Sequence, residues 1–199
     1  WHKARMKAAA KMQEEFDCAV LDMHPNDFLV GGNVDPEEVF DQSKKPFDPT
    51  TEAQLRDWYP IAVDKVPLHV GRILCQRENL LYDSDVRKTY ARVLRVGLAA
   101  VFLALFYYSL AAGLQLDAVV LTVWVPAMPA ITWALREIFR QADTVETLSR
   151  LKSESEKLWK SAAAGPMAPE AAAERSRELQ DAIYSHRVSS PLVFDFLYR

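Results

Sequence analysis

A run of forty residues from Val96 to Leu135 carries a single formal charge, Asp117, and constrains the fold more than any other feature. As one straight helix this run would extend roughly 60 Å, about twice the hydrocarbon thickness of a bilayer. We therefore expect a hairpin of two membrane spans, about Val96–Leu116 and Ala118–Leu135, with Asp117 in the turn near the lipid headgroups. The alternative is a buried helical hairpin of a soluble protein, but soluble core helices rarely run 18 or more residues without a charge.

Basic side chains flank the apolar run on both sides, and the turn between the spans has none. They are Arg87, Lys88, Arg92 and Arg95 before it, and Arg136, Arg140, Arg150 and Lys152 after it. Because segments rich in Lys and Arg stay on the cytoplasmic side, we expect both flanking regions in the cytoplasm and the turn outside. The sequence then divides into a helical cytoplasmic region (1–83), a transmembrane hairpin (84–140) and C-terminal cytoplasmic helices (141–199).

The first residues resemble the cytoplasmic end of a membrane span. An aromatic residue, Trp1, is followed by the basic residues Lys3, Arg5, Lys7 and Lys11. Aromatic anchors followed by basic residues are typical of such a membrane exit. We expect that an N-terminal portion that ends in a membrane span precedes this segment and is missing from the chain.

Apolar residues also recur at helical spacing outside the hairpin, and no strand-like alternation competes, so we expect an all-α membrane protein. The first helix, about His2–Met23, should be amphipathic and pack through its apolar positions. These positions are Met6, Ala9, Ala10, Phe16, Val20 and Met23. Asp35 should cap a short helix whose first residue is Pro36.

The remaining elements follow from similar signals. Thr51 and Gln54 form a weak capping box. Helices are predicted over about Ile61–Leu81, over about Ser84–Leu116 with Asp83 or Ser84 as cap, from the second span to about Lys160, and over about Glu170–His186. A linker is predicted over Ala162–Pro169. Pro126 and Pro129 should kink the second span, because proline removes a backbone donor. The aromatic tail from Ser189 to Tyr198 should pack on the cytoplasmic helices or on the membrane surface.

The sequence lacks the motifs of common enzymes and metal sites. Its six glycines form neither GxGxxG nor a Walker loop, its four histidines form no HExxH, and Cys18 and Cys75 show no CxxC spacing. The formal net charge of −3 gives no overall positive field for nucleic acid. We therefore predict no enzyme activity, no catalytic residue, no metal, no cofactor, and no DNA or RNA partner.

Two clusters of cytoplasmic side chains have the chemistry to bind an anion, because guanidinium groups suit phosphates and aromatic rings stack on bases. The first cluster contains Trp58, Tyr59, Arg72, Arg77 and Asn79, and the second contains Arg175, Arg177, Tyr184 and Arg187. From these, the candidate ligand-binding residues are Trp58, Tyr59, Arg72, Arg77, Asn79 and Arg187. The alternative is that Arg72 and Arg77 pair with Glu78, Asp83 or Asp85, and that Trp58 and Tyr59 are core residues.

Several phrases, taken together, resemble one family. They are QEEFDCAVLDM (Gln13–Met23), LRDWYP (Leu55–Pro60), ILCQRENLLYDSDVRKTY (Ile73–Tyr90) and LQDAIYSHRVSSPLVFDFLYR (Leu179–Arg199). Placed around a hydrophobic hairpin, they resemble the SMODS-associated four-transmembrane effectors, the S-four-TM family of CBASS anti-phage systems. The resemblance covers most of the chain. It implies four membrane spans, so that an upstream transmembrane pair would precede Trp1 and be missing from this chain.

The resemblance implies a non-enzymatic effector of the bacterial inner membrane. A functionally linked nucleotidyltransferase would make a cyclic oligonucleotide as second messenger and activating ligand. The cytoplasmic part would bind this ligand, and the protein would form a homo-oligomer that disrupts the lipid bilayer and causes abortive infection. The alternative is a two-span membrane interaction or pore-forming protein of the related SLATT type, which no nucleotide gates.

Overall fold

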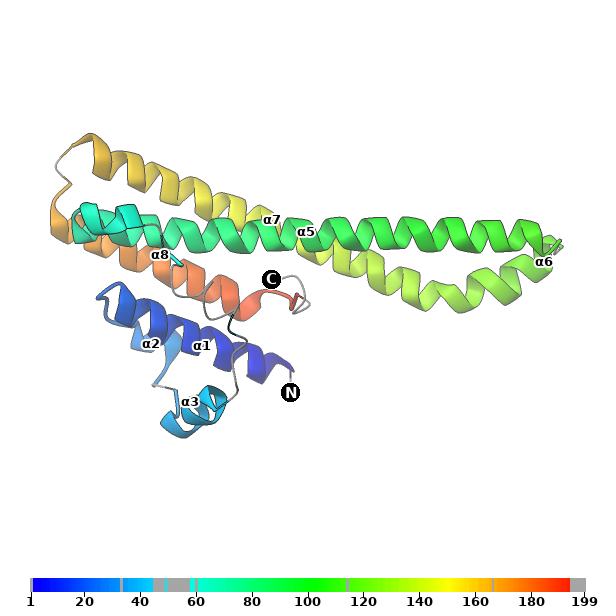
Figure 1. The fold of residues 1–199 in the computed structure, drawn as a ribbon, viewed down its shortest axis with the longest axis horizontal. Coiled ribbons are helices and arrows are strands. Elements are labelled where there is room, and N and C mark those ends of the chain that lie inside the picture. Colours follow the sequence, from blue (N-terminus) through cyan, green and yellow to red (C-terminus); the bar gives the residue numbers. More distant parts are fainter. Residues whose placement is uncertain are drawn as a thin grey trace. The chain divides into compact units, whose positions relative to one another are not determined.

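A computed structural model describes residues 2–32, 34–44, 49, 58–59, 61–113, 115–165 and 167–193 (Figure 1). Every regular element in these residues is a helix, so the predicted all-α fold is confirmed. In chain order the elements are α1 (His2–Val20), α2 (Asp27–Val30), α3 (Pro36–Ser43), the 3-10 helix η1 (Ile61–Lys65), α5 (Leu68–Ala111), α6 (Leu116–Val119), the π-helix η2 (Val120–Trp124), α7 (Val125–Ala164) and α8 (Pro169–Ser189).

The chain forms two compact units. One unit, here called the helical body, is made of residues 1–83 and 147–192, and the other, the hairpin unit, is made mainly of residues 84–146. The helices α5 and α7 each contribute residues to both units. Each unit is described by itself.

The helix α5 is one continuous element of 44 residues. It begins at Leu68 and has no break at Asp83 or Ser84, so the predicted cap at that position is wrong. Ile61–Lys65 form the separate 3-10 helix η1 rather than the first turns of an α-helix. Pro67 separates the two elements, and its carbonyl accepts the first backbone hydrogen bonds of α5. Asp83 and Ser84 are good caps only where a helix begins, and here the helix already exists.

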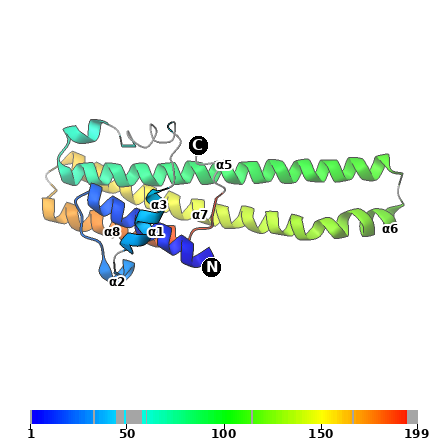
Figure 2. The same ribbon diagram turned by 60° about the horizontal axis from the view of Figure 1, so that its bottom comes forward.

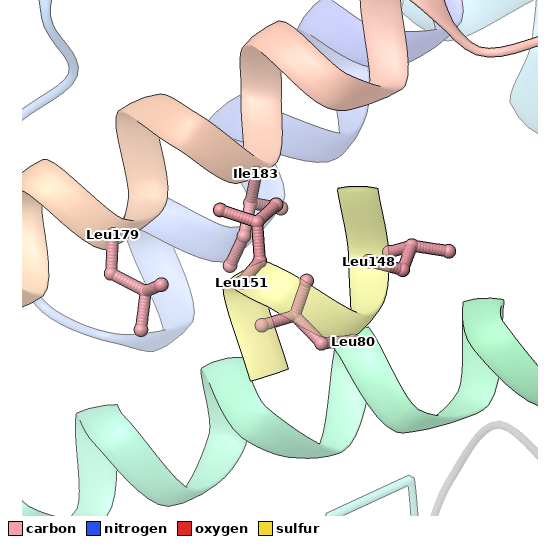
Figure 3. Close-up of a cluster of buried hydrophobic side chains, with 5 residues drawn as sticks. All are labelled: Leu80, Leu148, Leu151, Leu179 and Ile183. Carbon is pink, nitrogen blue, oxygen red and sulfur yellow. The ribbon is translucent and has the colours of Figure 1, made fainter. Parts of the chain in front are cut away.

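The main apolar core of the helical body lies where α5, α7 and α8 meet (Figure 3). Its buried members are Leu80 from α5, Leu148 and Leu151 from α7, and Leu179 and Ile183 from α8. The pairs on α7 and α8 are spaced three and four residues apart, so each pair faces one side of its helix. Full burial stabilises each of these side chains by about 1.5–3 kcal/mol.

The helix α1 lies along α8 (Figure 2), and the face that it buries includes two carboxylates. The buried residues of this face are Ala10, Glu14, Asp17, Cys18 and, just after the helix, Leu21. The predicted packing residues Phe16 and Val20 are instead 59% and 48% exposed. The prediction of an apolar packing face was therefore wrong at these positions. Glu14 and Asp17 are buried instead, because α8 supplies partners for their carboxylates.

The hairpin unit holds the apolar run. In α5, no residue of the most apolar 18-residue window is buried. In residues 116–164, 17% of the residues in the most apolar 18-residue window are buried. The rings of Phe102 and Trp124, one from each apolar segment, lie with their centroids 5.4 Å apart. Large apolar side chains such as Leu103 and Phe106 are exposed on the outside. This exposure favours spans that face lipid over the buried hairpin of a soluble protein.

The turn of the hairpin lies earlier than predicted. The helix α5 ends at Ala111, and Gly113 adopts a positive φ of 59°, a conformation that glycine tolerates at helix C-termini. Asp117 is not in the turn but in the first turn of α6, where the helix dipole favours a negative charge.

The second apolar segment is irregular at its prolines. The π-helix Val120–Trp124 ends two residues before Pro126, and the backbone N–H of Val125 reaches back five residues to the carbonyl of Val120. Pro129 lies inside α7. Proline cannot donate a helical hydrogen bond, and a π-turn is one way to accommodate the missing donor. Figure 1 shows the chain curving over this stretch.

The remaining predictions concern the ends of helices. Asp35 Oδ1 accepts the backbone N–H of Glu37 at 3.0 Å, and Pro36 is the first residue of α3, so this cap is confirmed. The helix α7 continues to Ala164, so Ala162–Ala164 are helical and not part of a linker. The helix α8 exceeds its predicted range at both ends. The capping box at Thr51 and Gln54, and residues 194–198 of the tail, lie outside the described residues.

Candidate functional site

The predicted candidates Trp58, Tyr59 and Asn79 lie together in the helical body. Trp58 Nε1 donates to Asn79 Oδ1 at 3.1 Å, and Asn79 Nδ2 donates to the hydroxyl of Tyr59 at 3.2 Å. The ring of Trp58 also packs edge-on against Tyr82, with 4.7 Å between centroids. Burial and the negative charge of Asp17 raise the pKa of Tyr59 to about 12. These contacts join the segment before η1 to the first half of α5.

Arg72 fixes the end of α1. Its Nε donates to the carbonyl of Leu21 at 2.6 Å, and its Nη2 donates to the carbonyl of Asp22. Its Nη2 also lies 3.6 Å from a carboxylate oxygen of Asp22. Carbonyls at the end of a helix lack intrahelical donors, so a guanidinium from another helix supplies them. Asp22 has a positive φ of 51°, which is uncommon for a residue other than glycine.

Two arginines of α8 neutralise the buried carboxylates of α1. Arg177 Nη2 lies 2.6 Å from Glu14 Oε1, and Arg187 Nη1 lies 2.6 Å from Asp17 Oδ2. Glu14 is fully buried and Asp17 is 3% exposed. Arg177 also donates to Asp181 and to the carbonyl of His24. Charge-assisted hydrogen bonds of this kind offset the desolvation of a buried carboxylate.

Amide side chains extend this network to α5. Gln180 Nε2 donates to both Glu14 Oε2 and Asp17 Oδ2, at 2.8 and 3.0 Å. Gln180 Oε1 in turn accepts from Gln76 Nε2 at 3.0 Å. The hydroxyl of Ser176 donates a hydrogen bond to Gln76 Oε1 at 2.9 Å. The network formed by Glu14, Asp17, Gln76, Ser176, Arg177, Gln180 and Arg187, here called the polar network, therefore links three helices that are distant in sequence.

Two further side chains lie beside the polar network. Burial raises the pKa of the Cys18 thiol to about 11, although the hydrogen bond from Arg177 opposes this shift. Among the residues that the structure describes, the buried hydroxyl of Tyr184 has no hydrogen-bond partner, and burial raises its pKa as well. Both groups are therefore neutral at physiological pH.

Arg77 lies apart from the other candidates, at a groove between α5 and α7. Its Nε lies 2.8 Å from Glu156 Oε2, and the groove has a volume of about 510 Å³. The groove, here called the basic groove, is lined by Arg77, Ser149, Lys152, Ser153, Glu156, Lys157 and Lys160. The lysines of this groove are not among the ligand-binding residues predicted from the sequence. Their signal was present, because Lys152, Glu156 and Lys160 are spaced four residues apart on one helix face.

A second cavity, of about 540 Å³, lies between the end of α7 and α8. Its walls include the apolar side chains of Leu158 and Met167 together with Arg175, whose Nη1 lies 2.8 Å from Glu178. Lys157 lines both this cavity and the basic groove. In the part of the chain that the structure describes, no three His, Cys, Asp or Glu side chains gather as metal ligands.

The structure therefore separates the six predicted candidates into four places. Trp58, Tyr59 and Asn79 form one contact group. Arg72 binds the end of α1, Arg187 belongs to the polar network, and Arg77 lines the basic groove. The arginines Arg72 and Arg77 find their carboxylate partners far away in sequence, at Asp22 and Glu156.

Comparison with known proteins assigns the family. A family model described as the SMODS-associating 4TM effector domain matches residues 1–199, which is the whole chain. The chain belongs to the SMODS-associating 4TM effector family. The resemblance found in the sequence is thereby confirmed.

A curated relative of this SMODS-associating 4TM effector is a probable CBASS effector molecule of Bacillus cereus strain VD146. It is 26% identical over 201 residues, which cover 97% of this chain and 63% of the relative. The chain thus spans less than two thirds of the relative's length. No solved structure matches the chain. Membership of a four-transmembrane effector family, together with the exposed apolar hairpin, identifies a membrane protein.

Proposed function

We propose that this chain is a non-enzymatic effector of bacterial anti-phage defence that disrupts the inner membrane when a cyclic oligonucleotide binds its helical body. The observation that carries the proposal is the family match over all 199 residues, which takes in both the apolar hairpin and the helical body. The name of the Bacillus cereus relative, a probable CBASS effector molecule, supports the same role. A CBASS system would link the protein to a nucleotidyltransferase that makes the ligand.

The hairpin unit supplies the membrane-active part of this proposal. Its apolar side chains are exposed and suited to lipid or to neighbouring spans. Two spans do not enclose an aqueous path, so disruption by a pore requires self-association into a homo-oligomer. Basic residues on both sides of the hairpin favour a topology with both flanking regions in the cytoplasm.

The helical body supplies the ligand-binding part. The residues Trp58, Tyr59, Arg72, Arg77, Asn79 and Arg187 are candidates for this role, and all lie in the helical body. Arg72, Arg77 and Arg187 each bind groups of the protein itself, but Arg77 also lines an open groove. A nucleotide made in the cytoplasm reaches the helical body directly if the proposed topology is correct.

The proposal is tested by reconstituting the full-length protein into vesicles that contain a fluorescent dye. Addition of members of a panel of cyclic di- and trinucleotides should release the dye and enlarge the oligomer measured by cross-linking. The double variant Leu103→Arg/Phe106→Arg should release no dye, because a charge at mid-membrane costs about 2.5–3.5 kcal/mol per residue.

Two results would count against the proposal. Dye release that is the same with and without nucleotide would favour a membrane protein of the SLATT type, which no nucleotide gates. Binding of a nucleotide without dye release or a change in oligomer size would separate the ligand from membrane disruption.

A further inference from the structure

We propose that the basic groove of the helical body is the site that holds the phosphodiester groups of the activating cyclic oligonucleotide. Its ligand-binding residues would be Arg77 of α5 and the side chains of Ser149, Lys152, Ser153, Lys157 and Lys160 on α7. This inference rests on the proposed function and adds the place and the chemistry of ligand binding.

The groove is built from one stripe of α7. Its α7 residues lie at positions 149, 152, 153, 156, 157 and 160, which repeat at the spacing of one helix face. The stripe extends about 17 Å along the helix, so it presents donors at several successive points. Arg77 faces this stripe from α5. A ligand with several phosphates can therefore contact more than one cation at once.

The groove has more positive than negative charge. Among the described residues that line it, four are cationic and one, Glu156, is a carboxylate. The guanidinium of Arg77 lies 2.8 Å from this carboxylate. Lys160 Nζ lies 3.7 Å from the same carboxylate. The hydrogen bond from Arg77, aided by the charges of Lys160 and Lys152, lowers the pKa of Glu156. Glu156 is thus shared by several cations and holds the place that an anionic ligand would take at Arg77.

The donor set suits phosphate. A guanidinium binds phosphate through two parallel hydrogen bonds, and lysines add point charges. Ser149 and Ser153 are exposed on the same stripe, and their hydroxyl groups can donate hydrogen bonds to the uncharged oxygens of the ligand.

A lipid headgroup carries the same phosphodiester chemistry. Lipid contacts, however, concentrate on basic residues directly beside a span, as Arg136 is. The stripe begins 14 residues after Leu135, the last residue of the apolar run. A soluble nucleotide is therefore the better match.

The test measures binding of a panel of cyclic di- and trinucleotides to the purified full-length protein by calorimetry. Arg77→Ala, and separately Lys152→Ala/Lys160→Ala, should raise the dissociation constant about tenfold or more, because each removes charge-assisted contacts. Lys157 is left unchanged because it lines both cavities and its Nζ lies 2.7 Å from Glu154. Higher salt should weaken binding of the wild type more than binding of the variants.

Two control variants should leave nucleotide binding unchanged, and one further variant should tighten it. Lys65→Ala removes an exposed lysine of the same unit, and Arg175→Ala removes the arginine of the neighbouring cavity. Both should stay within about twofold of wild type. Glu156→Gln should bind several-fold more tightly, because it removes the internal competitor for Arg77. This gain keeps the test valid even if a loss variant folds poorly, because reduced folding does not tighten binding.

The outcomes separate the groove from the proposed function. If the wild type binds a cyclic nucleotide and the groove variants bind it equally well, the groove inference is wrong while the proposed function stands. If no member of the panel binds the wild type, both are wrong. A second measurement compares the binding of the wild type and of the groove variants to vesicles that contain about 30% phosphatidylglycerol, an anionic lipid. If the groove variants lose only vesicle binding and keep nucleotide binding, the groove is a lipid site and the inference fails.

Discussion

The polar network makes a quantitative prediction for Glu14→Gln. Glu14 Oε1 accepts from Arg177 at 2.6 Å and from the Cys18 thiol at 3.4 Å, and Oε2 accepts from Gln180 at 2.8 Å. A glutamine keeps one acceptor oxygen and turns the other oxygen into an NH₂ donor. One existing donor must then face another donor in a fully buried position.

Rotation of the Gln180 amide does not relieve this conflict. Its NH₂ also donates to Asp17 Oδ2, and its oxygen accepts from Gln76, so a rotated amide would break both contacts. The variant loses a charge-assisted hydrogen bond, about 1.5–3 kcal/mol, and leaves a buried donor unsatisfied, about 1–3 kcal/mol. We expect a total loss of about 4 kcal/mol in the free energy of unfolding, a large fraction of the 5–15 kcal/mol typical of a domain.

The assay is denaturant unfolding of the purified protein in detergent, followed by far-ultraviolet circular dichroism. Glu154→Gln is the control, because Glu154 is 58% exposed and pairs with Lys157 on the surface. The control should change the free energy of unfolding by less than about 0.5 kcal/mol. Combining Glu14→Gln with Arg177→Met should give a coupling energy above about 1 kcal/mol. A loss of less than about 1 kcal/mol for Glu14→Gln alone would show that the carboxylate is not bound as described.

Three further predictions test other parts of the molecule. Leu148→Ala should lower the free energy of unfolding by about 3 kcal/mol because Leu148 is fully buried, whereas Leu192→Ala, at a residue that is 58% exposed, should change it little; equal losses would contradict the assigned core. The Cys18 thiol should react with iodoacetamide about a hundredfold more slowly than an exposed cysteine at pH 8, because a pKa of about 11 leaves about 0.1% thiolate instead of about 10%. Its rate should keep rising with pH up to about 11, and a plateau near pH 9 would refute the shift. In intact spheroplasts, a membrane-impermeant maleimide should label Gln115→Cys, whereas Arg150→Cys should be labelled only after lysis; the reverse pattern would overturn the topology.

Local signals predicted several features of the fold well. The cap at Asp35 and Pro36 was predictable because its chemistry involves neighbouring residues. The two long apolar helices were predictable because a run as long and as free of charge as Val96–Leu135 is rare in soluble helices. The start of α5 was not, since Asp83 and Ser84 form a plausible cap and only the helix that already precedes them excludes it.

The candidate site was harder to predict because its contacts are long-range. Arg77 was selected from its type and neighbours, but Lys152 and Lys160 lie on α7, more than 70 residues away in sequence. Likewise, nothing near Glu14 and Asp17 indicates that Arg177 and Arg187 will neutralise them. A carboxylate in an amphipathic helix belongs by default on the wet face, and only distant partners change that outcome.

The buried carboxylates of α1 also affect what separation of α1 from α8 would expose. Much of the newly wetted surface would be carboxylate, guanidinium and amide groups, all of which water solvates well. Opening the cluster around Leu148 would instead wet hydrocarbon alone. The boundary between α1 and α8 therefore combines these polar contacts with a small apolar cluster that contains Ala10, Tyr184 and Val188.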